Sequence, residues 1–362
     1  MRAASKHYVP ILKAREAEIT ALRNRPASLS VTPYFELQNA TPGTIDPATG
    51  LSKRSKSTVT DASYFMDDIA RLWDGSLYLD VSRVSNPTDG AQWWNLISSI
   101  TSLSPSNSAQ IIPAIAESDP SPSWRAAAPL AQAAGRAAMR VKLPHSDLPS
   151  LAGVISNAAS DVGLPTSSID VVMDWGDNLE ASAISLDSLT AHTSTLISAL
   201  GGLHGELISA GTPNSKGFVR DGYWHTTRRE WWLWLRLIAA DQDVSYGDYC
   251  LYPPSDPVRA TPQYGHLRYS NGEILHVHRK PKPSTGGGIS AAFSDCCTDL
   301  IGSTHYLGKG YSLADDYFDD IANGHKSTGQ PGIWRQYAAI HHFALVANQL
   351  QAPPPPPPSG TP

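Results

Sequence analysis

The sequence predicts a closed (β/α)8 barrel, and three observations support this fold class. Short apolar runs alternate along the chain with stretches of helical periodicity, a pattern typical of parallel βαβ units. Eight such runs occur, which is the number of strands in a barrel of this kind. The chain has 362 residues, enough for the ~250 of a typical barrel and for added segments. The predicted strands cover residues 8–13, 30–37, 76–83, 110–117, 137–143, 169–176, 205–211 and 244–252.

Helical patterns separate these runs. The first covers residues 15–25 and ends at Pro26, whose ring cannot continue a helix. The long polar segment 40–60 is expected to be a functional or disordered loop, because structureless loops of that length are otherwise uncommon in compact domains. The other helices are expected near residues 61–72, 92–103, 122–135, 147–162, 186–200 and 216–239.

The pattern changes after the eighth predicted strand. Residues 266–279 alternate around Asn271 and Gly272, a strong signal for a β-hairpin with a type I′ turn. The Pro- and Gly-rich residues 281–288 predict a flexible loop, and helical patterns follow at 313–324 and 332–350. We therefore expect one barrel domain over residues 1–350 that includes the hairpin, and a proline-rich, disordered tail at 351–362.

Composition excludes several classes of protein. A formal net charge of −5 argues against a protein that holds duplex nucleic acid through phosphate contacts. Three cysteines, two of them adjacent, cannot form a disulfide framework and indicate a reducing compartment. No apolar stretch is long enough to cross a membrane, and the first residues lack the apolar region of a signal peptide. We therefore expect a cytoplasmic protein.

Charged residues stand at or near the C-terminal ends of six predicted strands. Successive strand residues point to opposite faces, and a charge within an apolar run is costly unless it is paired or solvated. Barrel enzymes carry their chemistry at this end of the strands, so the set predicts a site at the barrel mouth. The alternative is that the charges pair with one another and only close the mouth. The six are Lys13, Glu36, Asp80, Glu117, Arg140 and Asp174.

The mixture of charges suggests phosphodiester or nucleotide hydrolysis first. Carboxylates can hold a divalent metal ion or serve as general acid and base, and the bases can hold a phosphate. The same mixture also suits Schiff-base chemistry on Lys13 or Lys142. The candidate catalytic residues are Lys13, Glu36, Asp80, Glu117 and Asp174, and the candidate substrate-binding residues are Arg15, Arg83, Arg140 and Lys142.

Two weaker signals lie outside the strand ends. His276 and His278 alternate in the hairpin and face one side, but a metal site would need a third ligand that the sequence does not identify. Trp224, Trp231 and Trp234 share one face of the predicted helix at 216–239. Arginine beside tryptophan can stack on nucleic-acid bases, but such a helix more often packs against the barrel.

Three segments carry a resemblance to a known family. The opening YVPILKAREAEITAL, the TPYFEL of the second strand and the closing GQPGIWRQYAAIHHFALVANQL resemble the "beta protein" family of tailed phages and bacteria. Ala17 replaces a glycine of the first motif, and FEL replaces LEI in the second. The resemblance implies a barrel with an added hairpin in a phage-related or defence setting, and it implies no particular reaction.

Two hypotheses about function follow. One is an enzyme that hydrolyses a phosphate ester or nucleotide-like ligand, for which a divalent metal is one candidate cofactor and the sequence identifies none. The other is a binding or interaction protein whose protein partner contacts the tryptophan helix, the hairpin or the proline tail. A concave pocket lined by the charged set would favour the enzyme. A mouth plugged by the hairpin or the C-terminal helix, with these charges mutually paired, would favour the binding protein.

Overall fold

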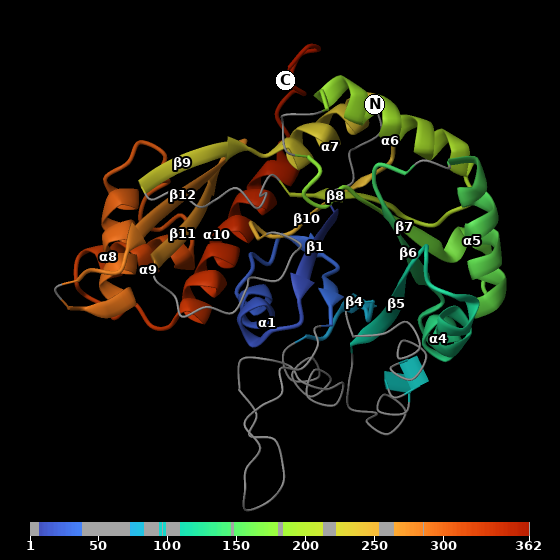
Figure 1. Ribbon diagram of the computed structural model, residues 1–362, viewed down its shortest axis with the longest axis horizontal. Coiled ribbons are helices and arrows are strands. Elements are labelled where there is room, and N and C mark those ends of the chain that lie inside the picture. The colour runs from blue at the N-terminus through green and yellow to red at the C-terminus, as the bar shows by residue number, and fades with distance from the viewer. Residues whose placement is uncertain are drawn as a thin grey trace, which may run out of the picture.

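The computed structural model describes residues 7–37, 73–82, 94–95, 97–98, 109–145, 148–179, 184–212, 222–252, 264–284 and 286–361. Figure 1 shows a barrel beside a smaller sheet, with one long helix, α10, between them. Each predicted strand run contains one strand of the barrel, so the predicted (β/α)8 fold is confirmed. No described helix is long and apolar enough to cross a membrane.

Eight parallel strands form the barrel. Pairing of the last strand with the first closes it, with Tyr246 opposite Tyr8. The second predicted run is split by Pro33 into two short strands, because proline donates no backbone hydrogen bond. Both pieces pair with the first strand, the shorter being β2 (Ser30–Val31). The barrel strands are β1 (His7–Lys13), β3 (Tyr34–Glu36), β4 (Ser76–Asp80), β5 (Gln110–Ala116), β6 (Ala137–Lys142), β7 (Ile169–Asp174), β8 (Leu207–Gly211) and β10 (Ser245–Asp248).

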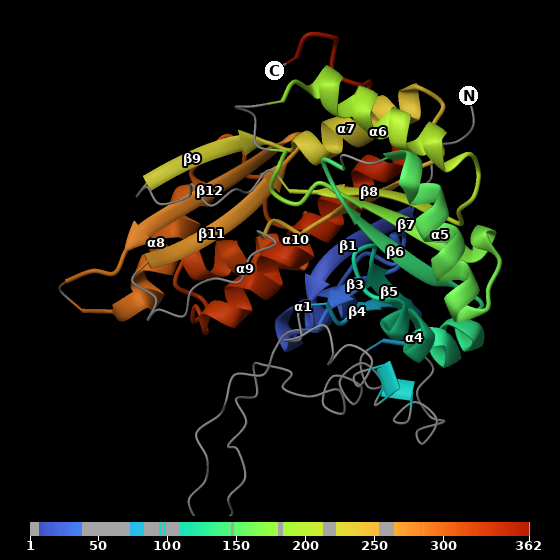
Figure 2. The same ribbon diagram turned by 45° about the vertical axis from the view of Figure 1, so that its right-hand side comes forward.

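Described helices lie outside the barrel (Figure 2). Their ends follow local sequence signals: α4 stops at Gly135, which has a φ of 67°, and the side chain of Ser185 caps α6. The predicted helix at 61–72 and the loop at 40–60 lie outside the described residues, as does most of the helix at 92–103. The helices are α1 (Glu16–Arg23), α4 (Ser121–Ala134), α5 (Leu148–Val162), α6 (Leu186–Leu200) and α7 (Arg229–Ala239).

Strand alternation produces two apolar cores. On β1, Val9 and Ile11 point into the barrel, whereas Tyr8 and Leu12 point toward the helices. The inner core is small, and polar layers lie at both of its ends. The outer core is larger and continues from the barrel helices into the added region.

The added region is a three-stranded antiparallel sheet with three helices. The predicted hairpin is confirmed as β11 (Tyr264–Asn271) and β12 (Ile274–Pro281), with Gly272 in the turn at a φ of 55°. A third strand, β9 (Gly222–Thr227), pairs with β12. The helices are α8 (Gly288–Ile301), α9 (Leu313–Ala322) and α10 (Pro331–Gln351).

The predicted helix at 216–239 is wrong over residues 222–227, and residues 216–221 lie outside the described residues. Residues 222–227 form β9, and the helix proper begins only at Arg229. The partner of β9 lies about fifty residues further along the chain, so no local pattern indicated the strand. Trp224 therefore lies in a strand, whereas Trp231 and Trp234 contact each other with ring centroids 4.9 Å apart and ring planes inclined by 32°, and both are fully buried. These two tryptophans are core residues that pack on Tyr246.

Two further segments extend beyond the predicted elements. The expected loop at 281–288 leads into α8, which the sequence did not predict because small and polar residues dominate it. In the tail, the guanidinium of Arg236 donates to the carbonyl of Pro358, and the amide of Gly360 donates to Asp187. We expected no fixed structure there, and the structure places these tail residues against α6 and α7 (Figures 1 and 2).

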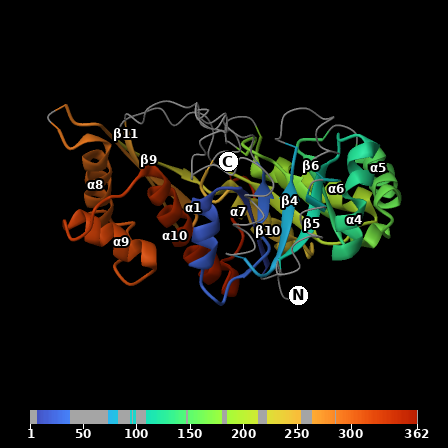
Figure 3. The same cartoon turned by 90° about the horizontal axis from the view of Figure 1, so that it is seen from below.

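One buried carboxylate joins the added region to the barrel. Asp248, at the end of β10, accepts hydrogen bonds from the hydroxyls of Tyr8 and Tyr246 and from Nε2 of His342 on α10, the last at 2.6 Å. Nδ1 of His342 lies 2.9 Å from the hydroxyl of Ser270 on β11. Seen from below, α10 lies between α1 and the α8–α9 pair (Figure 3). The seam between β1 and β10 is thus tied to α10 and β11.

We predict that Asp248→Asn lowers the free energy of unfolding by about 3–5 kcal/mol, because it leaves a buried hydrogen-bond network without its acceptor charge. Burial acts to raise the pKa of Asp248, but His342 and then Arg228 outweigh it, so this pKa is lowered. The stabilisation is therefore present above the unfolded pKa of ~4 and is lost as the pH falls below it. Urea unfolding at pH 7 measures the loss. Asp187→Asn is the surface control and should change the free energy of unfolding little. Equal stability of the two variants would contradict the conclusion that the network around Asp248 stabilises the fold.

Candidate functional site at the barrel mouth

Parallel pairing brings most of the predicted charged residues to one end of the barrel. In the strand register, Lys13 lies beside Glu36, Glu36 beside Asp80, and Lys142 beside Asp174. Arg140 stands one inward position below Lys142 on β6. Glu36, Asp80 and Asp174 all reach Arg140, so these four form one cluster inside the mouth.

Arg140 is the centre of this cluster, and all five of its N–H donors are engaged. Nε donates to Asp174 at 2.9 Å, and Nη1 donates to Glu36 at 2.7 Å and to Asp80 at 2.8 Å. Nη2 donates to Asp174 at 2.7 Å and to the Tyr249 hydroxyl. A guanidinium has five donors, so none is left for a bound anion. The side chain of Arg140 is only 4% exposed.

Two tyrosines complete the cluster, and the sequence analysis missed both as site residues. The hydroxyl of Tyr34 donates to Asp80, and that of Tyr249 donates to Asp174, each at 2.8 Å. Burial and then the nearby carboxylate raise the pKa of Tyr34, and burial raises that of Tyr249. Tyr34 shares the strand face of Glu36, so alternation could have found it. Tyr249 follows β10, and no local pattern indicated it.

A strained turn directs Tyr249 into the mouth. Cys250 and Leu251 both have positive φ, 47° and 72°, in a region that residues other than glycine rarely adopt. The backbone amide of Cys250 donates to Asp248 at 2.8 Å, which holds the turn. Asp248 therefore faces the outer network while Tyr249, the next residue, faces the barrel interior.

Glu117 and Lys142 lie at the rim and do not join Arg140. Ile115, which shares the strand face of Glu117, belongs to the outer core. Glu117 instead lies 3.3 Å from Nε2 of His145, and Lys142 is exposed. Partial burial raises the pKa of Glu117 against the opposing effect of His145, and burial raises that of Asp119. A carboxyl group with a raised pKa is suited to proton transfer.

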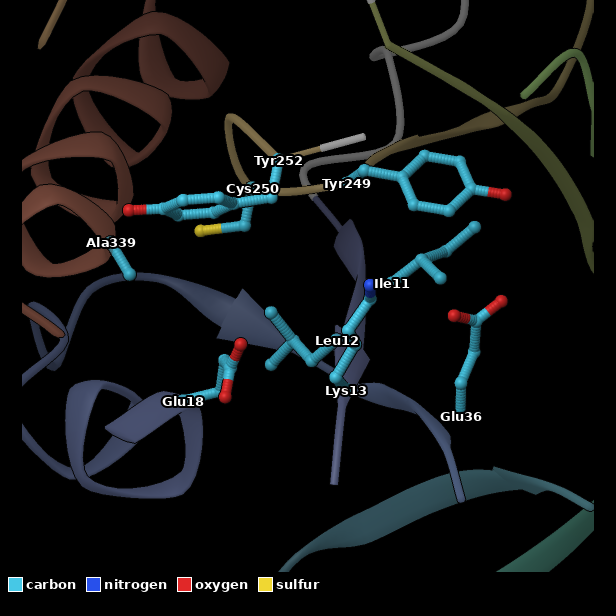
Figure 4. Close-up of a pocket in the computed structure, with 9 residues that line it drawn as sticks. All are labelled: Ile11, Leu12, Lys13, Glu18, Glu36, Tyr249, Cys250, Tyr252 and Ala339. Atoms are coloured by element: carbon cyan, nitrogen blue, oxygen red, sulfur yellow. The ribbon is translucent and has the colours of Figure 1, made fainter. Parts of the chain in front are cut away.

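The remaining predicted residues flank the mouth. Arg15 is half-buried and immediately precedes α1, and Arg83 lies outside the described residues. Lys13 is buried and lines a small pocket between β1, α1, the turn after β10 and α10 (Figure 4). Glu36 and Tyr249 line the same pocket, whose volume of about 10 Å³ is that of a single water molecule.

A similar ionic cluster lies at the opposite end of the barrel. Arg136 donates to Asp170 at 3.0 Å and to Glu206 at 3.1 Å, and the Tyr78 hydroxyl also donates to Asp170. This end of a (β/α)8 barrel serves stability rather than chemistry. The barrel therefore uses an arginine surrounded by carboxylates and tyrosine as a way to fill its ends.

The carboxylates at the mouth are not arranged around a metal position. The guanidinium of Arg140 occupies the space among Glu36, Asp80 and Asp174 where a divalent ion would be held. No group of three or more His, Cys, Asp or Glu side chains among the described residues is arranged to hold a metal ion.

We predict that Arg140→Met destabilises the protein by about 3–5 kcal/mol, because it leaves three buried carboxylates without their counter-charge. Lys142→Met, on the same strand but exposed, is the matched control and should change stability little. Chemical denaturation at pH 7 measures both. Unchanged stability of Arg140→Met would mean that the cluster does not hold the barrel mouth together.

The effect of Arg140→Met should also depend on pH. Burial acts to raise the pKa of Asp80, but the charge of Arg140 and hydrogen bonds from Ser82 outweigh it, so this pKa is lowered. The Asp80 carboxylate therefore stabilises the fold above its unfolded pKa of ~4, and this stabilisation is lost as the pH falls through its folded pKa. The stability difference between wild type and Arg140→Met should therefore shrink between pH 5 and pH 3 in urea titrations. A difference that stays constant over this range would contradict the ionic origin of the stabilisation.

Comparisons with known proteins identify a family for this chain and supply no activity. No curated protein matches the chain. Among solved structures, a glucosidase from Croceicoccus marinus is 10% identical with a TM-score of 0.37, covering 64% of this chain and 54% of its own. A mandelate racemase/muconate lactonizing protein from Herpetosiphon aurantiacus is 11% identical with a TM-score of 0.35, covering 74% of this chain and 60% of its own. The chain thus spans between half and two thirds of the length of these structures. The family described as Beta protein matches residues 8–348, and this chain belongs to that family.

Proposed function

We propose that this protein is a binding or interaction protein that uses the barrel mouth for recognition, and not a metal-assisted hydrolase. The observation that carries the proposal is the saturation of Arg140, whose five donors all engage groups of the protein itself. A phosphate would have to displace carboxylates that are already held at 2.7–2.9 Å. A divalent metal would have to displace the guanidinium.

The charges of the mouth also favour a ligand other than a phosphate. Three carboxylates surround one guanidinium, and Glu117 and Asp119 add further acids at the rim. Lys13 and Lys142 offset part of this negative charge. Such a surface attracts ligands that carry positive charge or hydrogen-bond donors, because its own donors are engaged and its acceptors are numerous. The phage-related or defence setting that the family resemblance implies is compatible with a recognition role.

A second candidate function rests on Glu117 and His145. The two side chains are 3.3 Å apart, and the pKa of Glu117 is raised by partial burial. A carboxyl group beside an imidazole at a barrel rim can exchange protons with a ligand, which would support metal-independent acid–base chemistry. This hypothesis keeps Glu117 as a catalytic candidate and assigns Asp80 and Asp174 to the structure of the mouth.

We expect a thermal-shift screen to separate these functions. Ligand binding to the native state raises the melting temperature, so a cationic probe such as spermidine should raise it, and Mn²⁺ with nucleotides should not. The shift should shrink in Glu117→Gln, which changes only the rim, and persist in the distant surface control Asp320→Asn. Hydrolysis of bis(p-nitrophenyl) phosphate that requires Mn²⁺ and is lost in a folded Asp80→Asn variant would overturn the proposal. Metal-free turnover of any probe that is lost in Glu117→Gln would support the second candidate.

A further inference from the structure

Four histidines gather in the added region, away from the barrel mouth. His225 on β9 lies opposite His276 on β12, and His278 follows two residues later on the same face. His305 comes from the segment between α8 and α9, more than 25 residues away in the sequence. The sequence analysis identified His276 and His278 and found no third member. The barrel network and the proposed recognition site use none of the four.

The rings are arranged in a specific way. Nε2 of His278 and Nε2 of His305 face each other at 3.0 Å, with ring planes inclined by 32°. The ring of His276 stacks on that of His305 with centroids 3.9 Å apart. Tyr223 stacks on His305 from outside and is 47% exposed, so the cluster lies just below the surface.

Surrounding contacts hold this arrangement before any ligand arrives. The Asn271 side-chain amide donates to the carbonyl of His305 at 2.8 Å. The Tyr223 hydroxyl and Nδ1 of His276 share a hydrogen bond of 2.8 Å. Nδ1 of His278 is buried and has no hydrogen-bond partner. Lys280, two residues after His278, forms an ion pair with Asp299 at 2.6 Å.

The pKa is lowered for three of these imidazoles, those of His276, His278 and His305. Burial first, and the neighbouring His305 second, lower the pKa of His276 to about 3 and that of His278 to about 4. Burial also lowers the pKa of His305. Neutral imidazole nitrogen is the form that binds transition metals.

We propose that His278 and His305 bind a divalent transition metal through their two Nε2 atoms. Nitrogens 3.0 Å apart, each ~2.0 Å from a shared ion, subtend an angle of about 97° at that ion, which is closer to 90° than to the tetrahedral angle. This angle suits the square-planar or octahedral geometry of Cu²⁺ and Ni²⁺ better than the tetrahedral geometry of Zn²⁺. Because no third protein ligand is in place among the described residues, water completes the coordination. The ion therefore exchanges with solvent past Tyr223.

The structural alternative is a simple N–H···N hydrogen bond that only positions the segment between α8 and α9. The two explanations predict different affinities of the protein for metal ions. A hydrogen-bonded pair alone gives no metal affinity above that of scattered surface histidines. A metal site loses its affinity when either nitrogen is removed.

Isothermal titration of the untagged full-length protein with CuCl₂, NiCl₂ and ZnCl₂ at pH 7.5 tests the proposal. We expect one Cu²⁺ or Ni²⁺ per chain, with Zn²⁺ weaker, and an electron paramagnetic resonance spectrum of the Cu²⁺ form that shows nitrogen ligands. His305→Ala should weaken Cu²⁺ binding by at least about tenfold. His325→Ala, at an exposed histidine outside the cluster, should leave Cu²⁺ binding unchanged.

His278→Gln provides a second test that does not depend on the His305 segment, and circular dichroism verifies that each variant is folded. If His278→Gln does not fold, the result for His305→Ala decides alone. The side chain of His305 is only partly buried, so we expect this variant to fold. Cu²⁺ binding that survives in His305→Ala, or no binding of any of the three metals to wild type, would overturn the proposal.

Discussion

The structure depends on the seam where β10 closes the barrel against β1. A parallel barrel of eight strands has no free edge only if its last strand meets its first, and here both strands carry tyrosines that converge on Asp248. The same carboxylate receives His342 from α10, which in turn contacts Ser270 of β11. One buried acid thus closes the barrel and attaches the added sheet. Arg228, fully buried, donates to Tyr246 and to Gln349 and extends the same network.

Buried ion pairs recur throughout this protein, and their energetics shape the functional interpretation. Two charges taken out of water repay their desolvation only with excellent geometry and full hydrogen bonding. Arg140 meets this condition because all five of its donors make short contacts. At the opposite end of the barrel, Arg136 donates to Asp170, Tyr78 and Glu206. Groups so fully engaged with one another have little capacity left for a ligand. Recognition is therefore expected at the rim, where Glu117, Lys142 and His145 are reached by solvent.

The added region brings chemistry of a different kind. Its cluster of His276, His278 and His305 is neutral, and the rings of His276 and His305 are stacked, whereas the barrel clusters are charged and paired. Carboxylates around a guanidinium favour cationic groups. Paired imidazole nitrogens favour soft or borderline metal ions. The two parts of the molecule can therefore take different ligands, and they are linked through α10 and the Asp248 network.

Local sequence patterns were enough to predict the barrel, the hairpin and the end of the barrel at which charges collect. Alternation and periodicity are local signals, so eight strands and the Asn271–Gly272 turn could be predicted from neighbours in the chain. Strand parity likewise placed Glu36, Asp80, Arg140 and Asp174 at one mouth. Strand parity failed for Glu117, whose strand face turned outward, and helical periodicity failed for Trp224, which lies in a strand whose partner is far along the chain.

The role of those charges depends on contacts that form only when the strands assemble into the barrel. Whether Arg140 is open to a ligand depends on how many acceptors surround it, and these come from three other strands and from Tyr249 after β10. The meeting of His278 with His305 likewise joins elements that no local pattern connects. Periodicity tells which way a side chain points along its own strand. Its partners are set by barrel closure and packing, which bring together residues more than a hundred positions apart, as with Arg140 and Tyr249.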